Sequence, residues 1–212
     1  MRNPWHNRWI SPESFLNEGF DSDSFDRRLA WLNEPRRWSI DAGSSALVIE
    51  PESDTDFWRR THYGFEADSG HLLSAAVAGN FAVTTKVKFF HKHQYDQAGL
   101  MIRVDAASWI KTSVEYELNE ASKLGVVVTN RGYSDWSLQD FDSTRNELWL
   151  RISKTASDCV VDHSADGLAW HTIRVAHLDV PPDAVLHCGL YACSPNGSGF
   201  RADFDFLRID SA

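Results

Sequence analysis

Short segments in which apolar and polar residues alternate with a period of two recur along most of this chain. Such alternation is typical of β-strands buried on one face, because successive side chains of a strand point to opposite sides of the sheet. Turn-forming residues separate the segments, and many strands without helices predict a sandwich or a barrel. At least ten strands are expected, from residues 38–40, 46–49, 81–89, 98–104, 110–118, 125–129, 148–152, 159–162, 170–175, 185–192 and 204–209.

The length of 212 residues suits one all-β domain, because sandwiches of this size commonly form a single unit. We expect residues 25–212 to form the sandwich and residues 1–24 to form an N-terminal arm packed on it. The order Ser11-Pro12 is typical of a helix start, so one short helical turn is predicted over residues 11–17.

The net charge of −9 disfavours nucleic acid and anionic membranes as partners, because phosphate groups repel an acidic protein. The first seven residues lack the apolar core of a signal sequence, and no long apolar run follows. The cysteines are few and odd in number, at positions 159, 188 and 193, which predicts buried free thiols rather than a disulfide framework. These features together predict a cytoplasmic location.

Two neighbouring predicted strands carry a polar face. If they pair as a hairpin, strand alternation places Gln97, Arg103, Trp109, Lys111 and Glu115 on one surface, with apolar residues on the other. Acceptors, donors and an aromatic plane complement the hydroxyls and flat C–H faces of sugars. The alternative is a solvated sheet face with weak cross-strand ion pairs.

Two aromatic segments are expected to be loops beside this face. Residues 55–65 contain Trp58 and His62, and residues 133–137 contain Asp135 and Trp136. Loops on a rigid scaffold are common binding sites. Alternatively, these aromatic side chains close the ends of the sandwich.

Five short motifs occur along the chain in a fixed order, namely residues 55–58 (TDFW), 95–101 (YDQAGLM), 109–111 (WIK) with Glu115-Tyr116, 134–137 (SDWS), and Ser194-Pro195 with Gly199-Phe200. By these motifs the chain resembles the domain family of unknown function that includes the fungal regulation-of-enolase protein. The resemblance runs from about residue 25 to residue 209. It implies a concanavalin A-like jelly roll with one convex and one concave sheet, and in relatives with that fold glycans bind or are cleaved on the concave face. The family supplies no catalytic residues to carry over.

Glycoside cleavage requires a pair of carboxyl groups, about 5–10 Å apart. The alternating acidic motif of the related glucanases, Glu-x-Asp-x-x-Glu, is absent from this sequence. Glu115 and Asp135 form the candidate pair. Lys111 and Arg103 nearby are expected to lower the pKa of Glu115, which would oppose a general-acid role.

No metal or cofactor is predicted. His91 and His93 lie on one side of a strand but have no third ligand with telling spacing, and the acidic residues at 21 and 23 lack a full set of calcium ligands. Phosphate-binding glycine loops and dinucleotide fingerprints are also absent.

These observations favour a domain that binds a saccharide or polyol without catalysis. The first alternative is a hydrolase or other enzyme acting on a sugar derivative. The second is a protein-interaction module that regulates a metabolic enzyme, which would expose an apolar patch to a protein partner. The predicted ligand-binding residues are Trp58, His62, Gln97, Arg103, Trp109, Lys111, Glu115, Asp135 and Trp136.

Overall fold

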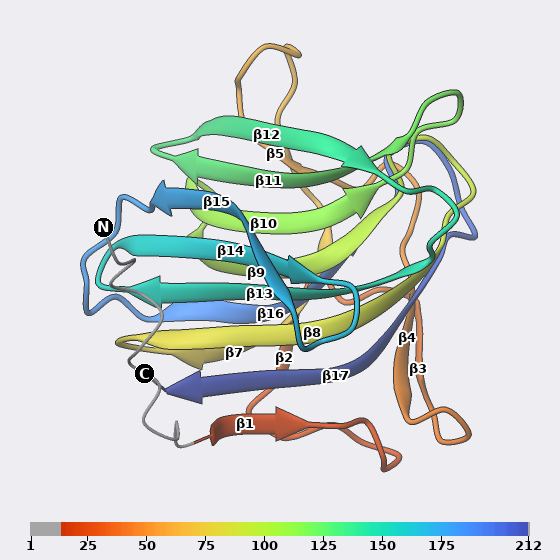
Figure 1. The fold of residues 1–212 in the computed structure, drawn as a ribbon, viewed down its shortest axis with the longest axis horizontal. Coiled ribbons are helices and arrows are strands. Elements are labelled where there is room, and N and C mark those ends of the chain that lie inside the picture. The colour runs from red at the N-terminus through yellow and green to blue at the C-terminus, as the bar shows by residue number, and fades with distance from the viewer. Residues whose placement is uncertain (1–13, 212) are drawn as a thin grey trace.

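The computed structural model describes residues 14–211, which form two stacked antiparallel sheets (Figure 1). The first sheet comprises β1 (Ser14–Glu18), β3 (Arg37–Asp41), β4 (Ala46–Glu50), β8 (Phe81–Phe90), β13 (Glu147–Thr155), β14 (Asp158–Ser164), β15 (Trp170–His177) and β17 (Arg201–Ser211). The second comprises β2 (Ala30–Leu32), β7 (His71–Val77), β9 (Gln97–Asp105), β10 (Ser108–Glu115), β11 (Ser122–Asn130), β12 (Tyr133–Phe141) and β16 (Leu186–Cys193). A short hairpin consists of β5 (Phe57–Trp58) and β6 (Ala67–Asp68).

The strand order is that of a sandwich with many crossovers between its layers. It runs β15-β14-β13-β8-β17-β4-β3 in the first sheet, with β1 also paired to β17, and β12-β11-β10-β9-β16-β7-β2 in the second. The prediction of a concanavalin A-like jelly roll of two curved antiparallel sheets is thereby confirmed. Within residues 14–211 no helix is long and apolar enough to cross a membrane.

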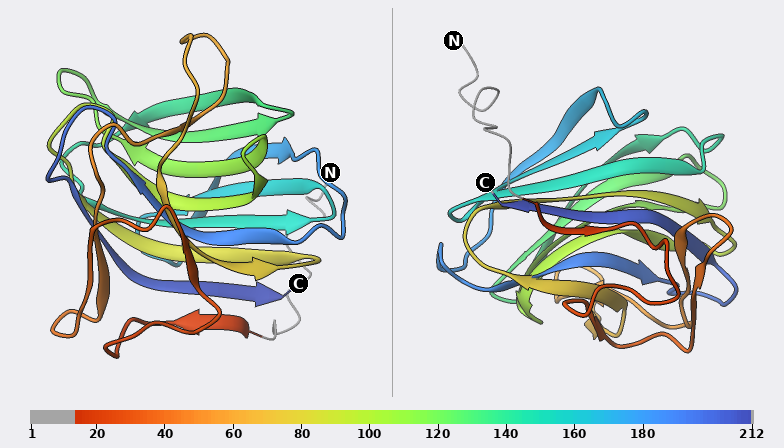
Figure 2. Two further views of the ribbon diagram at one scale, coloured as in Figure 1. Left: turned by 180° about the vertical axis from the view of Figure 1, so that it is seen from behind. Right: turned by 90° about the horizontal axis from the view of Figure 1, so that it is seen from below.

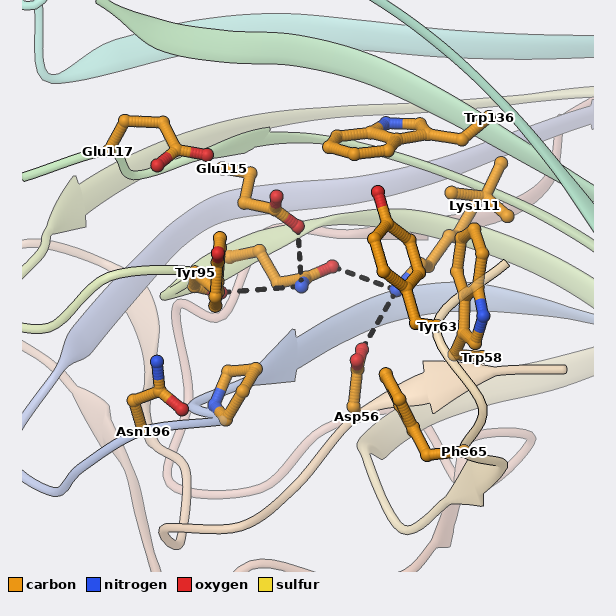
Figure 3. Close-up of a pocket in the computed structure, with 13 residues that line it drawn as sticks. Asp56, Trp58, Tyr63, Phe65, Tyr95, Lys111, Glu115, Glu117, Trp136 and Asn196 are labelled. Atoms are coloured by element: carbon orange, nitrogen blue, oxygen red, sulfur yellow. Dashed lines mark hydrogen bonds and ion pairs between the residues drawn. The ribbon is translucent and has the colours of Figure 1, made fainter. Parts of the chain in front are cut away.

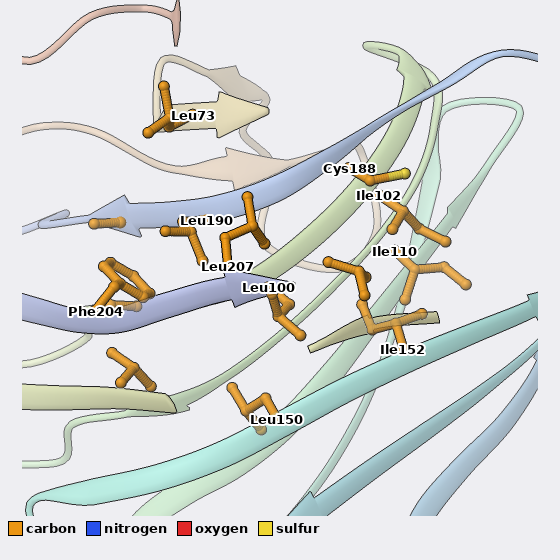
Figure 4. Close-up of a cluster of buried hydrophobic side chains, with 14 of the residues drawn as sticks. Leu73, Leu100, Ile102, Ile110, Leu150, Ile152, Cys188, Leu190, Phe204 and Leu207 are labelled. Atoms are coloured by element: carbon orange, nitrogen blue, oxygen red, sulfur yellow. The ribbon is translucent and has the colours of Figure 1, made fainter. Parts of the chain in front are cut away.

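The main core lies between the sheets, where alternate side chains of both layers meet (Figure 4). Leu100 and Ile110 enter it from the second sheet, and Leu150 and Phe204 enter it from the first, all with no exposed surface. Each such side chain contributes roughly 1.5–3 kcal/mol by leaving water. The three cysteines are buried and unbridged, as predicted.

The predicted helical turn is wrong over residues 14–17, which belong to β1; residues 11–13 lie outside the described chain. β1 pairs with β17 in register from Leu16 to Glu18, and the side chain of Leu16 is 1% exposed. The backbone of β17 forms hydrogen bonds with β1, and the side chain of Leu16 packs in the core. These tertiary contacts outweigh the local preference for a helix start.

Residues 133–137, predicted as a loop, belong to the edge strand β12. β11 is its one partner strand, and most of its side chains are exposed, so no clear alternation marks it in the sequence. The strand predicted over residues 110–118 ends at Glu115, and Leu118 is exposed rather than buried in the core.

One buried carboxylate fixes the loops at the end of the second sheet. Asp96 is fully buried, and its carboxylate accepts hydrogen bonds from the backbone N–H groups of Lys92 and His93, both at 2.8 Å. It also accepts one from the hydroxyl of Ser194 at 2.5 Å. Asp96 therefore ties the turn before β9 to the residues that follow β16.

We expect Asp96→Ala to lower the free energy of unfolding by about 1–3 kcal/mol, because three donors, of which the Ser194 hydroxyl is buried, would lose their acceptor. Asp96→Asn retains one acceptor oxygen and should cost less. Urea denaturation, with an unchanged slope, measures both values. A loss below about 0.5 kcal/mol for Asp96→Ala would contradict this role for the carboxylate.

Candidate functional site

The chain between β4 and β7 covers part of the outer face of the second sheet. Seen from behind, this orange segment crosses in front of the sheet (Figure 2, left). The hairpin β5–β6 rests there on a second apolar cluster, separate from the main core. The cluster consists of Phe57, Trp58, Leu72, Met101, Trp109, Val127, Tyr191 and Cys193.

Two buried cations hold the ends of this hairpin. Lys111 on β10 donates to Asp56, the residue before β5, over 3.1 Å. Arg103 on β9 makes two hydrogen bonds, of 2.8 and 3.2 Å, to Asp68 at the end of β6. The side chains of Lys111 and Arg103 are only 5% and 8% exposed. The sheet thus fixes the position of the hairpin through both of its ends.

A pocket of about 330 Å³ opens beside the hairpin (Figure 3). This volume lies at the lower end of the range for small-molecule sites, roughly 300–1,000 Å³. Aromatic rings, carboxyl groups and amides make up most of the wall. The lining residues are Asp56, Trp58, Tyr63, Phe65, Tyr95, Gln97, Lys111, Glu115, Glu117, Val127, Trp136, Pro195 and Asn196.

A chain of polar side chains runs along the floor of the pocket (Figure 3). The ammonium of Lys111 donates to Asp56 and, over 2.9 Å, to the side-chain carbonyl of Gln97. The amide nitrogen of Gln97 donates to Glu115 over 2.9 Å. Gln97 and Glu115 are direct partners in the β9–β10 register, so the sheet itself brings them together.

The pKa of Glu115 is raised to about 8. Burial is the main cause, since it disfavours the charged carboxylate, and the negative charges of Asp56 and Glu117 add to it. Lys111 opposes the shift but does not outweigh it. The prediction that this pKa is lowered is therefore wrong. The covering segment removes water from Glu115, and the resulting cost of charging the carboxyl group exceeds the stabilisation by Lys111, whose ammonium is already bonded to Asp56 and Gln97.

The pKa of Lys111 is also raised. Burial alone would lower it, but the negative charge of Asp56, and to a lesser extent the Cys193 thiol and Glu115, stabilise the ammonium. Lys111 is therefore a fixed positive charge.

Five of the predicted binding residues line the pocket, namely Trp58, Gln97, Lys111, Glu115 and Trp136. Their role in binding stays a prediction.

Two predicted residues are sealed beneath the hairpin. Trp109 has no exposed surface, and its indole N–H donates to the backbone oxygen of Ala106. Arg103 is occupied by Asp68. Both point to the predicted side of the sheet, but alternation does not reveal that another segment covers them there.

His62 and Asp135 lie in an adjoining groove that shares Trp58, Tyr63 and Trp136 with the pocket. Asp135 is paired with Arg174 over 3.0 Å and does not line the pocket. The pair proposed for hydrolysis, Glu115 with Asp135, is therefore not brought together in one cavity.

Several lining residues were not among the predicted ligand-binding residues. Asp56, Tyr63 and Phe65 belong to the aromatic segment of residues 55–65, and Glu117 lies two residues beyond Glu115, after the end of β10. Tyr95 lies in the 95–101 motif, and Asn196 directly follows Ser194-Pro195. Within residues 14–211 no three His, Cys, Asp or Glu side chains gather to hold a metal ion.

The raised pKa of Glu115 predicts a pH-dependent stability. Between an unfolded pKa near 4.5 and the folded value of about 8, the folded state binds more protons, so stability falls as the pH rises. Glu115→Gln removes this dependence. Its free energy of unfolding relative to the wild type should rise by at least about 1 kcal/mol from pH 5 to pH 8, then level off. Urea denaturation at several pH values measures this, and a pH-independent difference would contradict the raised pKa.

Comparison with known proteins gives a family and a fold. The family model described as "Protein of unknown function (DUF1349)" matches residues 31–212. The chain is 33% identical over 174 residues to "Regulation of enolase protein 1" of Saccharomyces cerevisiae, which covers 82% of this chain and 85% of that protein. A crystal structure of a functionally unknown protein from Saccharomyces cerevisiae is similar with a TM-score of 0.80 and 31% identity, covering 87% of this chain and 97% of that one.

A GH43 protein from Bacillus licheniformis shares the fold, with a TM-score of 0.75 at 18% identity. The match covers 92% of this chain but only 39% of that protein, so it concerns one part of a longer molecule. The family match and the yeast relative decide the assignment: the chain belongs to the DUF1349 family, whose function is not known.

Proposed function

We propose that this chain binds a saccharide or a related polyol, without catalysis, in the pocket beside the β5–β6 hairpin. The observation that carries the proposal is an open cavity with aromatic walls and an ordered chain of hydrogen-bonding groups on its floor.

The chemistry of the wall is complementary to a sugar. The rings of Trp58, Tyr63, Tyr95 and Trp136 offer apolar planes for C–H faces. Glu115 lines the cavity, where its carboxyl group can hydrogen-bond hydroxyl groups. A small number of well-placed polar groups in a mostly apolar cavity is the usual composition of small-molecule sites.

The site is also preorganised. The hydrogen bonds from Lys111 to Gln97 and from Gln97 to Glu115 hold these side chains in place before a ligand arrives. Trp136 lies against β11 so closely that a Cβ atom added to Gly125 would approach the indole nitrogen to 2.6 Å. Side chains that are already fixed lose less entropy on binding.

The absence of catalysis is proposed from the same contacts. Asp56 is paired with Lys111, and Glu115 is bonded to Gln97, so internal partners occupy both groups. The likeness to the GH43 protein concerns the fold, and fold alone does not carry an activity.

We expect Trp136→Ala to weaken the binding of a sugar about 10-fold or more, because a stacking plane would be lost. Isothermal titration calorimetry against a panel of neutral monosaccharides and short oligosaccharides measures the affinity.

The matched control is Leu138→Ala, since Leu138 lies two residues further along β12, is 48% exposed and does not line the pocket. Its affinity should equal that of the wild type. No heat with any sugar, or equal losses in both variants, would count against the proposal.

A further inference from the structure

We propose that the ligand preferred by this pocket carries a cationic amine, as in an amino sugar or an amino polyol. This inference rests on the proposed function, because it assigns a ligand class to the same cavity. It starts from the charges of the lining residues. Asp56, Glu115 and Glu117 present three carboxyl groups, whereas Lys111 is the single cationic side chain among the lining residues.

The ammonium of Lys111 is occupied by partners in the floor of the pocket. Its side chain is 5% exposed and donates to Asp56 and Gln97. One cation therefore faces three acidic groups, and Asp56 is the group that it neutralises. The remaining carboxyl groups, Glu115 and Glu117, form no ion pair with Lys111, although its charge acts on Glu115 from a distance.

Other cations near the pocket are also engaged elsewhere. Lys123 is opposite Glu115 in the β10–β11 register, but it binds Asp140 over 2.8 Å and Glu120 over 3.5 Å and does not line the pocket. Arg59 and Arg60 on the covering segment both bind Glu66. Lys123 is therefore paired with carboxylates outside the cavity, and Arg59 and Arg60 share one. An anionic ligand would be repelled here, and a cationic one attracted.

The aromatic wall favours the same ligand. Trp58, Tyr63, Phe65, Tyr95 and Trp136 line the pocket, and the faces of such rings attract cations. The Trp58 and Tyr63 rings meet edge to face with centroids 5.2 Å apart. In Figure 3, Glu115 and Glu117 lie on one side of the cavity, and Trp58, Tyr63 and Trp136 lie on the other. An amine between them would meet carboxyl oxygens and ring faces together.

The raised pKa of Glu115 makes this binding sensitive to pH. At neutral pH much of Glu115 is protonated in the free protein, and a bound ammonium favours its ionised form. Tyr95, whose pKa burial and Glu117 raise, stays neutral in this range. An amine that remains protonated through pH 8 should therefore bind more tightly as the pH rises from 6 to 8.

Matched ligand pairs test the inference by titration calorimetry in amine-free buffer. The pairs are glucose with glucosamine and sorbitol with N-methylglucamine. N-acetylglucosamine is the control for the size of the substituent, because it carries a neutral group where glucosamine carries the amine. We expect each amine to bind at least about 10-fold more tightly than its neutral partner at pH 7. The affinity for N-methylglucamine should increase from pH 6 to pH 8.

Two variants test whether the preference for an amine depends on Glu115. Glu115→Gln should abolish the pH dependence and the preference for the amine, so that both members of each ligand pair bind with equal affinity. Asp158→Asn removes an equal charge from an exposed site on β14, and it should leave the preference unchanged. Persistence of the preference and its pH dependence in Glu115→Gln would overturn the assignment of the amine to Glu115.

The outcomes separate this inference from the proposed function. Equal affinity for glucose and glucosamine would overturn the amine preference and leave saccharide binding standing. Binding of tetramethylammonium without binding of any sugar or polyol would support a cation site and overturn the proposed function. No binding of any of these probes would overturn both.

Discussion

The buried ion pair between Lys111 and Asp56 is the interaction on which the rest of the site depends. A charge removed from water is costly unless a partner and hydrogen bonds replace the hydration. Asp56 and Gln97 do so for Lys111, and Asp68 does so for Arg103 further along the same sheet face. Through these contacts the sheet holds both ends of the β5–β6 hairpin, and the hairpin in turn buries the second apolar cluster.

The covering hairpin turns an open sheet face into a pocket with unusual electrostatics. It supplies Trp58, Tyr63 and Phe65 as walls, and it withdraws water from the polar residues below. Glu115 consequently favours its neutral form at a pH where an exposed carboxyl group would be charged. An acidic, aromatic and preformed cavity is the basis of both the proposed sugar binding and the inferred preference for an amine.

Alternation predicted most of the long strands of the sandwich, including the edge strands β3 and β15. It missed the short strands β1 and β2, the largely exposed β12, and β7, which lies between β16 and β2 and is buried on both faces, so that its side chains show no alternation. Lys154 marks another limit, because it occupies a core-facing position after Leu148, Leu150 and Ile152. It is fully buried there, and its ammonium donates to the backbone oxygens of Gly79 and Pro182.

The family resemblance implied the two-layer sandwich. By itself the strand alternation determined the all-β class and the side of the sheet to which Gln97, Lys111 and Glu115 point. These properties are local, because the pleat of a strand sets the direction of each side chain. Only the tertiary structure decided which of those side chains reach a ligand. Asp56 and Lys111 are 55 residues apart, and Asp68 and Arg103 are 35 apart. Strand periodicity carries no information about contacts at such separations, so the covering hairpin, the burial of Trp109 and the raised pKa of Glu115 follow from folding alone.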